Sequence, residues 1–363
     1  MLNPSRITLA RKRSRLTARE LADRAGISAV HMSRIEKGKA ENVDPATIAE
    51  LAKVTKFPYE FFFGDDVDTP NKDSTSFRSL TAMSAKERES ALAAGSIANI
   101  LSDWCESKFN LPEPDLPDYR HDVFPEAAAA SLRSYWGLGN KPVSNTIKLL
   151  ESKGVRVFSL SEDTRNVDAF SYWRNNIPYV FLNTKKTAER SRFDAMHELG
   201  HLVMHRHGKP QGRQAEYEAD RFAANLLMPH EDVQASIRRV NNLEQLFSAK
   251  QRWGVSVAAL SYRLHKLSII TDWQYKNFCI QLNSRYGQSE PNEMKRERSV
   301  VWEKIFRELW KEKVTRDGLA KKLSIPSSEI DSLVFNLLPR EESENSKVGL
   351  REITSSPKLS LAE

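Results

Sequence analysis

Apolar residues recur at helical intervals along most of this 363-residue chain. The helices that this pattern predicts span 84–108, 125–135, 143–153, 243–253, 257–267, 273–286, 300–313, 315–323 and 327–338. Shorter apolar runs predict strands at 155–160, 169–173 and 179–182, with a hairpin turn at 175–178 between the last two. The pattern therefore predicts a mainly α fold with a small antiparallel β-sheet, which precedes a further helix at 191–205.

The helix predicted at 191–205 carries the first candidate chemistry. It contains His197, Glu198 and His201 in an apolar segment without proline. Two histidines four residues apart lie about one helical turn from each other, so both can bind one metal ion. A glutamate directly after the first histidine can accept a proton from the attacking water. His205 lies one turn beyond His201, and we expect it to be a core or substrate-side residue.

A second helix is predicted at 216–229, where Pro229 ends it. Catalytic zinc usually takes three protein ligands, and Glu216 is the predicted third ligand. Asp220 lies on the same helical face, where it could accept the free ring N–H of a ligand histidine. Glu218 points roughly to the opposite side and is the weaker candidate. The alternative is that all three carboxylates are ordinary surface residues.

These two segments resemble the ImmA/IrrE family of zinc metallopeptidases, over about residues 77–291. Residues 192–193 and 253–256 also carry the resemblance. It implies a zincin-like α+β domain that cuts helix-turn-helix repressors. It also implies one zinc ion held by His197, His201 and Glu216, with Glu198 as the general base. No catalytic position is substituted.

The amino-terminal residues carry a different pattern. Thr17 and Glu20 form a predicted capping box, Gly26 supplies a tight turn, and Ser28 caps the next helix. The apolar positions of the two helices are Leu21, Ala22, Ala25, Ile27, Met32 and Ile35. This arrangement predicts a helix-turn-helix, whose second helix would enter the DNA major groove.

About the first 66 residues resemble the XRE, or lambda-repressor-like Cro/CI, family, and residues 33–39 match that family's end of the recognition helix and the following turn. Many members carry glutamine where this chain has Ala29, so their usual base preference does not transfer. The resemblance points to double-stranded DNA as a partner, and such domains often act as homodimers. The predicted DNA contacts are Ala29, Val30, His31, Arg34 and Lys39. The alternative is a small helical domain that binds protein or mediates dimerisation.

The charge distribution favours DNA. The chain has a formal net charge of +7. The segment up to Lys39 contains ten basic and three acidic residues, so 10 − 3 = +7 and the remainder is about neutral. A basic helix-turn-helix is typical of phosphate binding.

Composition and local sequence predict how the chain is organised. We expect a helix-turn-helix domain at 1–66, a polar linker at 67–80, a peptidase domain at 81–270, a C-terminal helical region at 271–339 and a disordered tail at 340–363. No apolar run is long enough to span a membrane, and no secretory signal is evident. Only two cysteines are present, so no disulfide framework is expected. These features predict a cytoplasmic protein.

The leading hypothesis for function is a DNA-binding transcriptional regulator with a zinc-dependent endopeptidase domain. Its substrate would be a repressor or antitoxin protein, and the strand at 179–183 would be an edge to which an extended substrate segment pairs. A purely structural strand is the alternative there. The rival function is a non-proteolytic transcription factor whose peptidase-like domain senses a ligand or mediates dimerisation.

Overall fold

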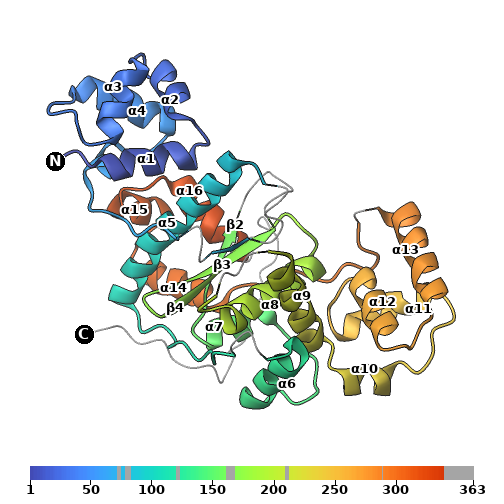
Figure 1. The fold of residues 1–363 in the computed structure, drawn as a ribbon. Coiled ribbons are helices and arrows are strands. Elements are labelled where there is room, and N and C mark those ends of the chain that lie inside the picture. The colour runs from blue at the N-terminus through green and yellow to red at the C-terminus, as the bar shows by residue number, and fades with distance from the viewer. Residues whose placement is uncertain are drawn as a thin grey trace, which may run out of the picture.

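The computed structural model describes residues 1–71, 75–77, 83–119, 123–160, 168–208, 212–287 and 289–338. It is mainly helical, with a small sheet at its centre (Figure 1). The predicted fold class is confirmed. The tail predicted at 340–363 lies outside the described residues. None of the helices that the structure describes combines the length and the apolar character that a bilayer span requires.

The N-terminal group of helices follows the predicted capping signals. The group consists of α1 (Pro4–Arg13), α2 (Ala18–Arg24), α3 (Ala29–Glu36), α4 (Pro45–Thr55) and the 3-10 helix η1 (Tyr59–Phe63). Thr17 and Glu20 form the capping box of α2, and Ser28 accepts a hydrogen bond from the His31 backbone N–H at 3.1 Å. Gly26 has a φ of +71°, a backbone conformation that is strained for residues with a side chain. Every predicted apolar position of this group is buried or partly buried.

The sheet has the strand order β1-β3-β4-β2, formed by β1 (Ser76–Phe77), β2 (Arg156–Leu160), β3 (Ala169–Arg174) and β4 (Ile177–Asn183). β3 and β4 form the predicted hairpin, and Asn175 and Asn176 both have positive φ, as a tight two-residue hairpin turn requires. The sheet is mixed, because β2 joins β4 as its parallel neighbour. The prediction of a purely antiparallel sheet is corrected in that respect.

The central position of β4 also corrects the prediction of a free edge at 179–183. β4 pairs with β3 on one side and β2 on the other, so its backbone has no edge for a substrate. Residues 179–182 are accordingly buried on both faces. The outer edge of β3 is paired by β1 at Ser171 and Phe170.

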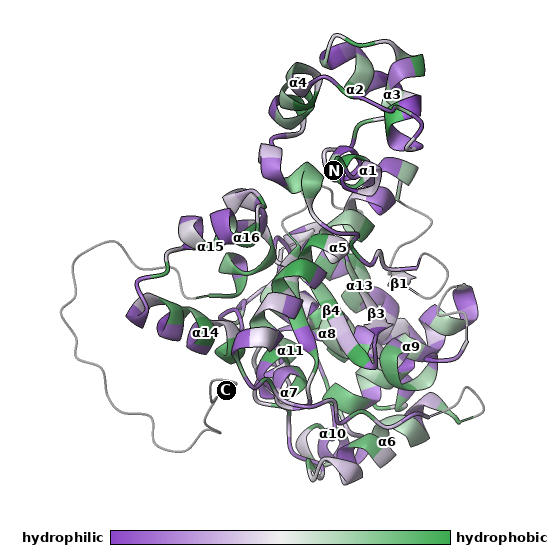
Figure 2. Ribbon diagram, turned by 90° about the vertical axis from the view of Figure 1, so that its left-hand side faces the viewer, coloured by the Kyte–Doolittle hydropathy of each residue, from purple (hydrophilic) through white to green (hydrophobic). Residues whose placement is uncertain are grey.

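Helices cover both faces of the sheet. On one face Tyr172 and Tyr179 stack across β3 and β4 with ring centroids 5.1 Å apart, and the Tyr172 hydroxyl bonds Asn99 of α5 (Ala85–Lys108). Ser171 points to the other face, toward α8 (Ala188–Met204). α9 (Arg213–Leu227) packs on α8, and α6 (Pro125–Tyr135) packs on α9. Figure 2 shows hydrophobic residues on α5, α8 and the strands between them.

The remaining helices extend the body at two ends (Figure 1). One group lies away from the N-terminal helices and consists of α10 (His230–Ser236), α11 (Glu244–Ala249), η2 (Lys250–Arg252), α12 (Val257–Lys266) and α13 (Asp272–Tyr286). The other lies beside α5 and β2 and consists of α14 (Val300–Lys311), α15 (Arg316–Lys322), α16 (Ser327–Leu333) and η3 (Phe335–Leu337).

The chain between residues 289 and 300 fastens the C-terminal helices to α8. Glu297 accepts a hydrogen bond from the backbone N–H of Thr146 in α7 (Thr146–Ser152) at 2.8 Å, and it pairs with Arg192 of α8. In return, Glu151 of α7 accepts a bond from the Val300 N–H at 2.9 Å, which satisfies the start of α14. This interlocking holds the beginning of α8 in place.

The N-terminal group contacts the body through α1. Arg13 donates to both carboxylate oxygens of Glu329 in α16 at 2.9 Å, and to the hydroxyl of Ser90 in α5 at 3.1 Å. The segment predicted as a linker, 67–80, supplies β1 and so joins the sheet; residues 72–74 and 78–80 lie outside the described part of the chain. The domain boundaries themselves stay predictions.

Candidate metal centre and nucleic-acid interface

Helix α8 carries the two histidines and the glutamate into the interior. Thr187 caps its first turn, and its last turn ends at His205. His197 and Glu198 are completely buried, and His201 is 3% exposed. Buried polar side chains are costly unless they find partners, so the contacts of these three residues show what the site is built for.

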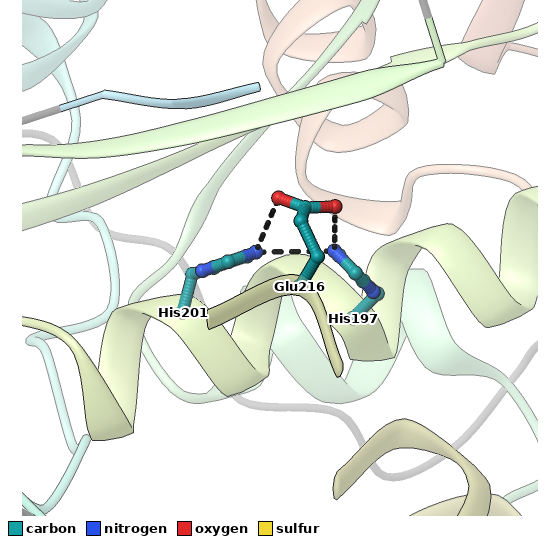
Figure 3. A group of neighbouring side chains, drawn as sticks. All are labelled: His197, His201 and Glu216. Carbon is teal, nitrogen blue, oxygen red and sulfur yellow. Dashed lines mark hydrogen bonds and ion pairs between the residues drawn. The ribbon is translucent and has the colours of Figure 1, made fainter. Parts of the chain in front are cut away.

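The side-chain donors of His197, His201 and Glu216 converge on one point (Figure 3). The two Nε2 atoms lie 3.1 Å apart, and each lies 3.5 Å from one oxygen of the Glu216 carboxylate. A tetrahedral zinc site with bonds of about 2.0–2.1 Å places its ligand atoms roughly 3.3 Å apart. The spacing and the donor types therefore fit a metal ion held by two imidazoles and one carboxylate.

Close packing of α8 and α9 brings Glu216 to the histidines. A Cβ atom on Gly200 would lie 3.1 Å from Cδ1 of Phe222 and 3.3 Å from Cα of Ala219. Glycine at position 200, between the motif's glutamate and second histidine, thus leaves room for α9. Glu216 lies in the first turn of α9, from which its side chain reaches both imidazoles.

The second ring nitrogen of each histidine, Nδ1, points away from Glu216 and also has a partner. Nδ1 of His197 lies 2.8 Å from Oδ1 of Asp220, where the sequence predicted that carboxylate. Nδ1 of His201 lies 3.0 Å from Nδ1 of His205, whose Nε2 lies 2.9 Å from Oε2 of Glu218. His205 is buried, as expected for a core residue. The expectation that Glu218 faces away is corrected, because its carboxylate contacts His205. Glu218 comes within reach because His205 stands at the end of α8, a turn beyond the metal group.

Two serines that the sequence analysis missed hold Glu198. Ser171 of β3 donates to Glu198 Oε2 at 2.7 Å, and the hydroxyl of Ser76 in β1 contacts the same oxygen. Oε1 of Glu198 is buried and has no hydrogen-bonding partner among the described residues. Neither serine lies near the motif in sequence, and only the pairing of Ser76 with Ser171 across β1 and β3 brings them together.

Burial and hydrogen bonds together set the charge states of the group. Burial raises the pKa of Glu198 to about 7, against the opposing effect of the nearby His197. Burial lowers the pKa of His201 to about 4, which favours the neutral imidazole that binds metals. Burial would raise the pKa of Glu216, but hydrogen bonds to His197 and His201 outweigh it and lower that pKa to about 2. The site thus holds neutral His201 beside ionised Glu216.

A groove of about 1230 Å³ runs beside the metal group, between α6, α9 and α12. Its lining includes Glu126, Arg133, Tyr217, Asp220 and Arg263. Asp220 and Tyr217 belong to the helix that supplies Glu216, but the three converging side chains are not part of the lining. The groove therefore lies next to the metal group rather than over it.

The predicted DNA contacts lie on α3 and the turn after it. Ala29, Val30, Arg34 and Lys39 are exposed, and His31 is half-buried. Val30 is 68% exposed, which is unusual for a large apolar residue. Arg11 of α1 donates to Glu36 at 2.6 Å and thereby fixes the last residue of α3 to α1. The inner side of α3 is therefore packed and anchored, while its outward side chains stay accessible.

Comparison with known proteins identifies two domains. Residues 150–265 match the family described as IrrE N-terminal-like domain (Peptidase_M78), and residues 5–60 match a helix-turn-helix domain. Over 50 residues, or 14% of this chain, it is 48% identical to the HTH-type transcriptional repressor RghR of Bacillus subtilis (strain 168). It is equally similar to the uncharacterized HTH-type transcriptional regulator RghRB of that strain.

These matches span 37% and 36% of the length of the two relatives, so they concern the helix-turn-helix alone. A helix-turn-helix domain is typical of DNA-binding proteins. The His197, His201 and Glu216 group falls within the other matched region. The chain is therefore a transcription-regulator homologue that joins an N-terminal helix-turn-helix domain to an IrrE N-terminal-like domain of the M78 peptidase family.

Proposed function

We propose that this chain is a DNA-binding regulator that cuts a partner protein with a zinc-dependent endopeptidase site. The observation that carries the proposal is the juxtaposition of three converging metal donors with the buried carboxylate of Glu198. Glu198 Oε1 lacks any partner among the described residues, although unpaired buried oxygens are costly. An acid placed in this way is suited to exchange a proton with a reacting molecule.

His197, His201 and Glu216 would hold the ion, and each of the two histidines is oriented through its other nitrogen. Zinc bound there would lower the pKa of water toward neutrality and polarise the peptide carbonyl. Glu198 would accept a proton on Oε1, while Ser171 and Ser76 keep Oε2 in place. Glu198 would then return the proton to the leaving amine.

The N-terminal helix-turn-helix domain supports a regulatory role. Arg34 and Lys39 would contact base edges or phosphates, and Ala29, Val30 and His31 would face the bases from the start of α3. The substrate would be a helix-turn-helix repressor or an antitoxin protein, and the chain would bind its operator as a homodimer. Both assignments extend the resemblance to the ImmA/IrrE and XRE families.

The rival function is a transcription factor whose peptidase-like domain only senses a ligand. The buried, serine-held Glu198 favours the enzyme, because metal binding alone does not need this residue. The test compares wild type with Glu198→Ala for zinc content and for cleavage of small helix-turn-helix proteins encoded by neighbouring genes. We expect zinc to stay and cleavage to fall by about 10²–10⁴-fold. Full cleavage by Glu198→Ala would disprove the mechanism.

A further inference from the structure

A chain of hydrogen bonds leads from His201 away from the metal group. His201 Nδ1 lies 3.0 Å from His205 Nδ1, and His205 Nε2 lies 2.9 Å from Glu218 Oε2. The other oxygen of Glu218 accepts a bond from the side chain of Gln214 at 2.6 Å. Both imidazoles are buried, and the Glu218 side chain is mostly so. This chain of hydrogen bonds thus ends on the carboxylate of Glu218, which Gln214 of the same helix holds in place.

The protons in this chain can be assigned from one requirement. A metal ion needs the lone pair of His201 Nε2, so the ring proton of neutral His201 must sit on Nδ1. That proton can only be donated to His205 Nδ1, which must then act as the acceptor. Neutral His205 therefore carries its own proton on Nε2, where the Glu218 carboxylate accepts it. Each bond in the chain has one donor and one acceptor only in this arrangement.

We propose that His205 and Glu218 are positioning residues that fix the tautomer and the ring orientation of the ligand His201. The proposal rests on the metal site of the proposed function but not on cleavage. Asp220 plays the same part for His197, through a direct bond. The two ligand histidines are thus supported differently, one by a carboxylate and the other by an imidazole with a carboxylate behind it.

His205 does not take the place of a ligand in this arrangement. Its Nδ1 faces the outer nitrogen of His201, and the donors that converge in the described part of the chain are those of His197, His201 and Glu216. Its backbone N–H bonds the His201 carbonyl at the end of α8, as any residue at that place would do. The side-chain contacts therefore call for an explanation beyond helix termination.

Helix α9 then supplies the three carboxylates that contact the histidines. Glu216 faces the Nε2 atoms of His197 and His201 and would bind the ion with them, while Glu218 and Asp220 act on the far side of the two imidazoles. Outer partners of this kind usually change metal affinity by about 10–100-fold. The position of α9 against α8 accordingly sets both the ligand and its supports.

The test measures Zn²⁺ affinity of the full chain by competition with a chelator, without any protein substrate. His205→Phe keeps the ring and removes both nitrogens, and Glu218→Gln keeps the shape and removes the charge. We expect each to weaken Zn²⁺ binding by about 10–100-fold. Because they interrupt one chain, the double variant should lose little more than the stronger single variant. His207→Ala, which removes an exposed histidine nearby, is the matched control and should bind as wild type does.

Two further measurements separate positioning from a merely structural role. The free energy of unfolding of the metal-free variants, measured with denaturant in the presence of a chelator, should fall by too little to explain the loss of Zn²⁺ affinity. The visible spectrum of the Co²⁺-loaded protein should change in His205→Phe and Glu218→Gln but not in His207→Ala. Affinities within twofold of wild type, or losses that simply add in the double variant, would overturn the proposal.

The outcomes also distinguish this proposal from the proposed function. A wild type that binds Zn²⁺ tightly but cuts nothing contradicts the peptidase, while the comparison of variants still tests the positioning residues. A wild type that does not bind Zn²⁺ contradicts both. Tight binding that both variants retain contradicts the positioning role alone.

Discussion

The metal group and the DNA-reading helix place their functional residues in opposite ways. His197, Glu198 and His201 are buried in α8, and each has partners from β1, β3, α9 or the end of α8. The outward residues of α3 are exposed, and only the inner side of that helix is packed. One site is organised by the tertiary structure before anything binds, while the other presents a surface that its ligand must complete.

This difference predicts how substitutions act. Loss of a buried partner leaves another polar group unsatisfied, so effects should spread to neighbours and combine non-additively. Loss of an exposed side chain removes only its own contact with DNA, so effects should be local and add. The predictions below test this contrast.

The largest effect is expected for Glu216→Ala. The binding free energy of Zn²⁺ in small protein sites is about 10–16 kcal/mol. Removal of one ligand of three should lower it by roughly 3–5 kcal/mol. Zn²⁺ affinity, measured by chelator competition, should fall by at least about 10²-fold. Operator binding in a gel-shift assay is the internal control and should not change. Unaltered Zn²⁺ affinity would show that Glu216 is not a ligand.

Gly200→Ala should separate the two helices of the metal site. The added methyl group meets Phe222 and the backbone of Ala219, and such overpacking costs about 1–3 kcal/mol of stability. Denaturant unfolding should show that loss, accompanied by weaker Zn²⁺ binding because Glu216 shifts with α9. The control variant is Ser134→Ala, on the exposed surface of α6. Gly137→Ala would be a poor control, because a φ of +65° is strained for any residue with a side chain. An unchanged Zn²⁺ affinity would show that α9 adapts.

The local parts of both sites could be predicted from the sequence. The spacing of His197 with His201, and of Glu216 with Asp220, reflects the geometry of a single helix, which depends only on neighbouring residues. The capping residues Thr17 and Ser28 likewise act within three positions. Such features need no knowledge of the tertiary fold, and the structure places all of these side chains where their spacing predicts.

The long-range parts could not be predicted. Ser76 and Ser171 meet Glu198 only because β1 pairs with β3, and nothing in either local sequence signals that pairing. The parallel neighbour β2 buries β4, which removed the edge expected there. His205 was expected only as a core or substrate-side residue, and its contacts with the Nδ1 atom of His201 and with Glu218 of a second helix could not be predicted from helical spacing alone.

Arg34→Ala tests the exposed site. If Arg34 contacts a base, operator affinity should fall by about 1–3 kcal/mol, as measured by fluorescence anisotropy at fixed salt. Lys148→Ala removes the same charge from exposed α7 surface and is the matched control. Stability and Zn²⁺ binding should not change in either variant. Equal affinity of both variants for the operator would remove Arg34 from the interface.

The smallest effect is expected for the coupling between the two sites. Residues of α3 and of the metal group share no contact among the described residues. The free-energy effects of changes at sites so separated usually add within about 0.3–0.5 kcal/mol. Zn²⁺ loading should therefore change operator affinity by no more than about twofold. By thermodynamic reciprocity, operator DNA should change Zn²⁺ affinity by the same factor.

Arg13 offers one structural route for a larger coupling, beside the ion pair between Glu20 of α2 and Lys86 of α5. Arg13 joins the N-terminal helices to Glu329 of α16 and Ser90 of α5, and α5 packs behind the sheet whose Ser171 holds Glu198. Glu329→Gln weakens the contact between Arg13 and α16 while leaving both sites intact, so it should reduce any coupling that passes through this contact. Coupling that persists in Glu329→Gln would show that the two regions communicate by another path, and that the contrast between a closed and an open site does not make them independent.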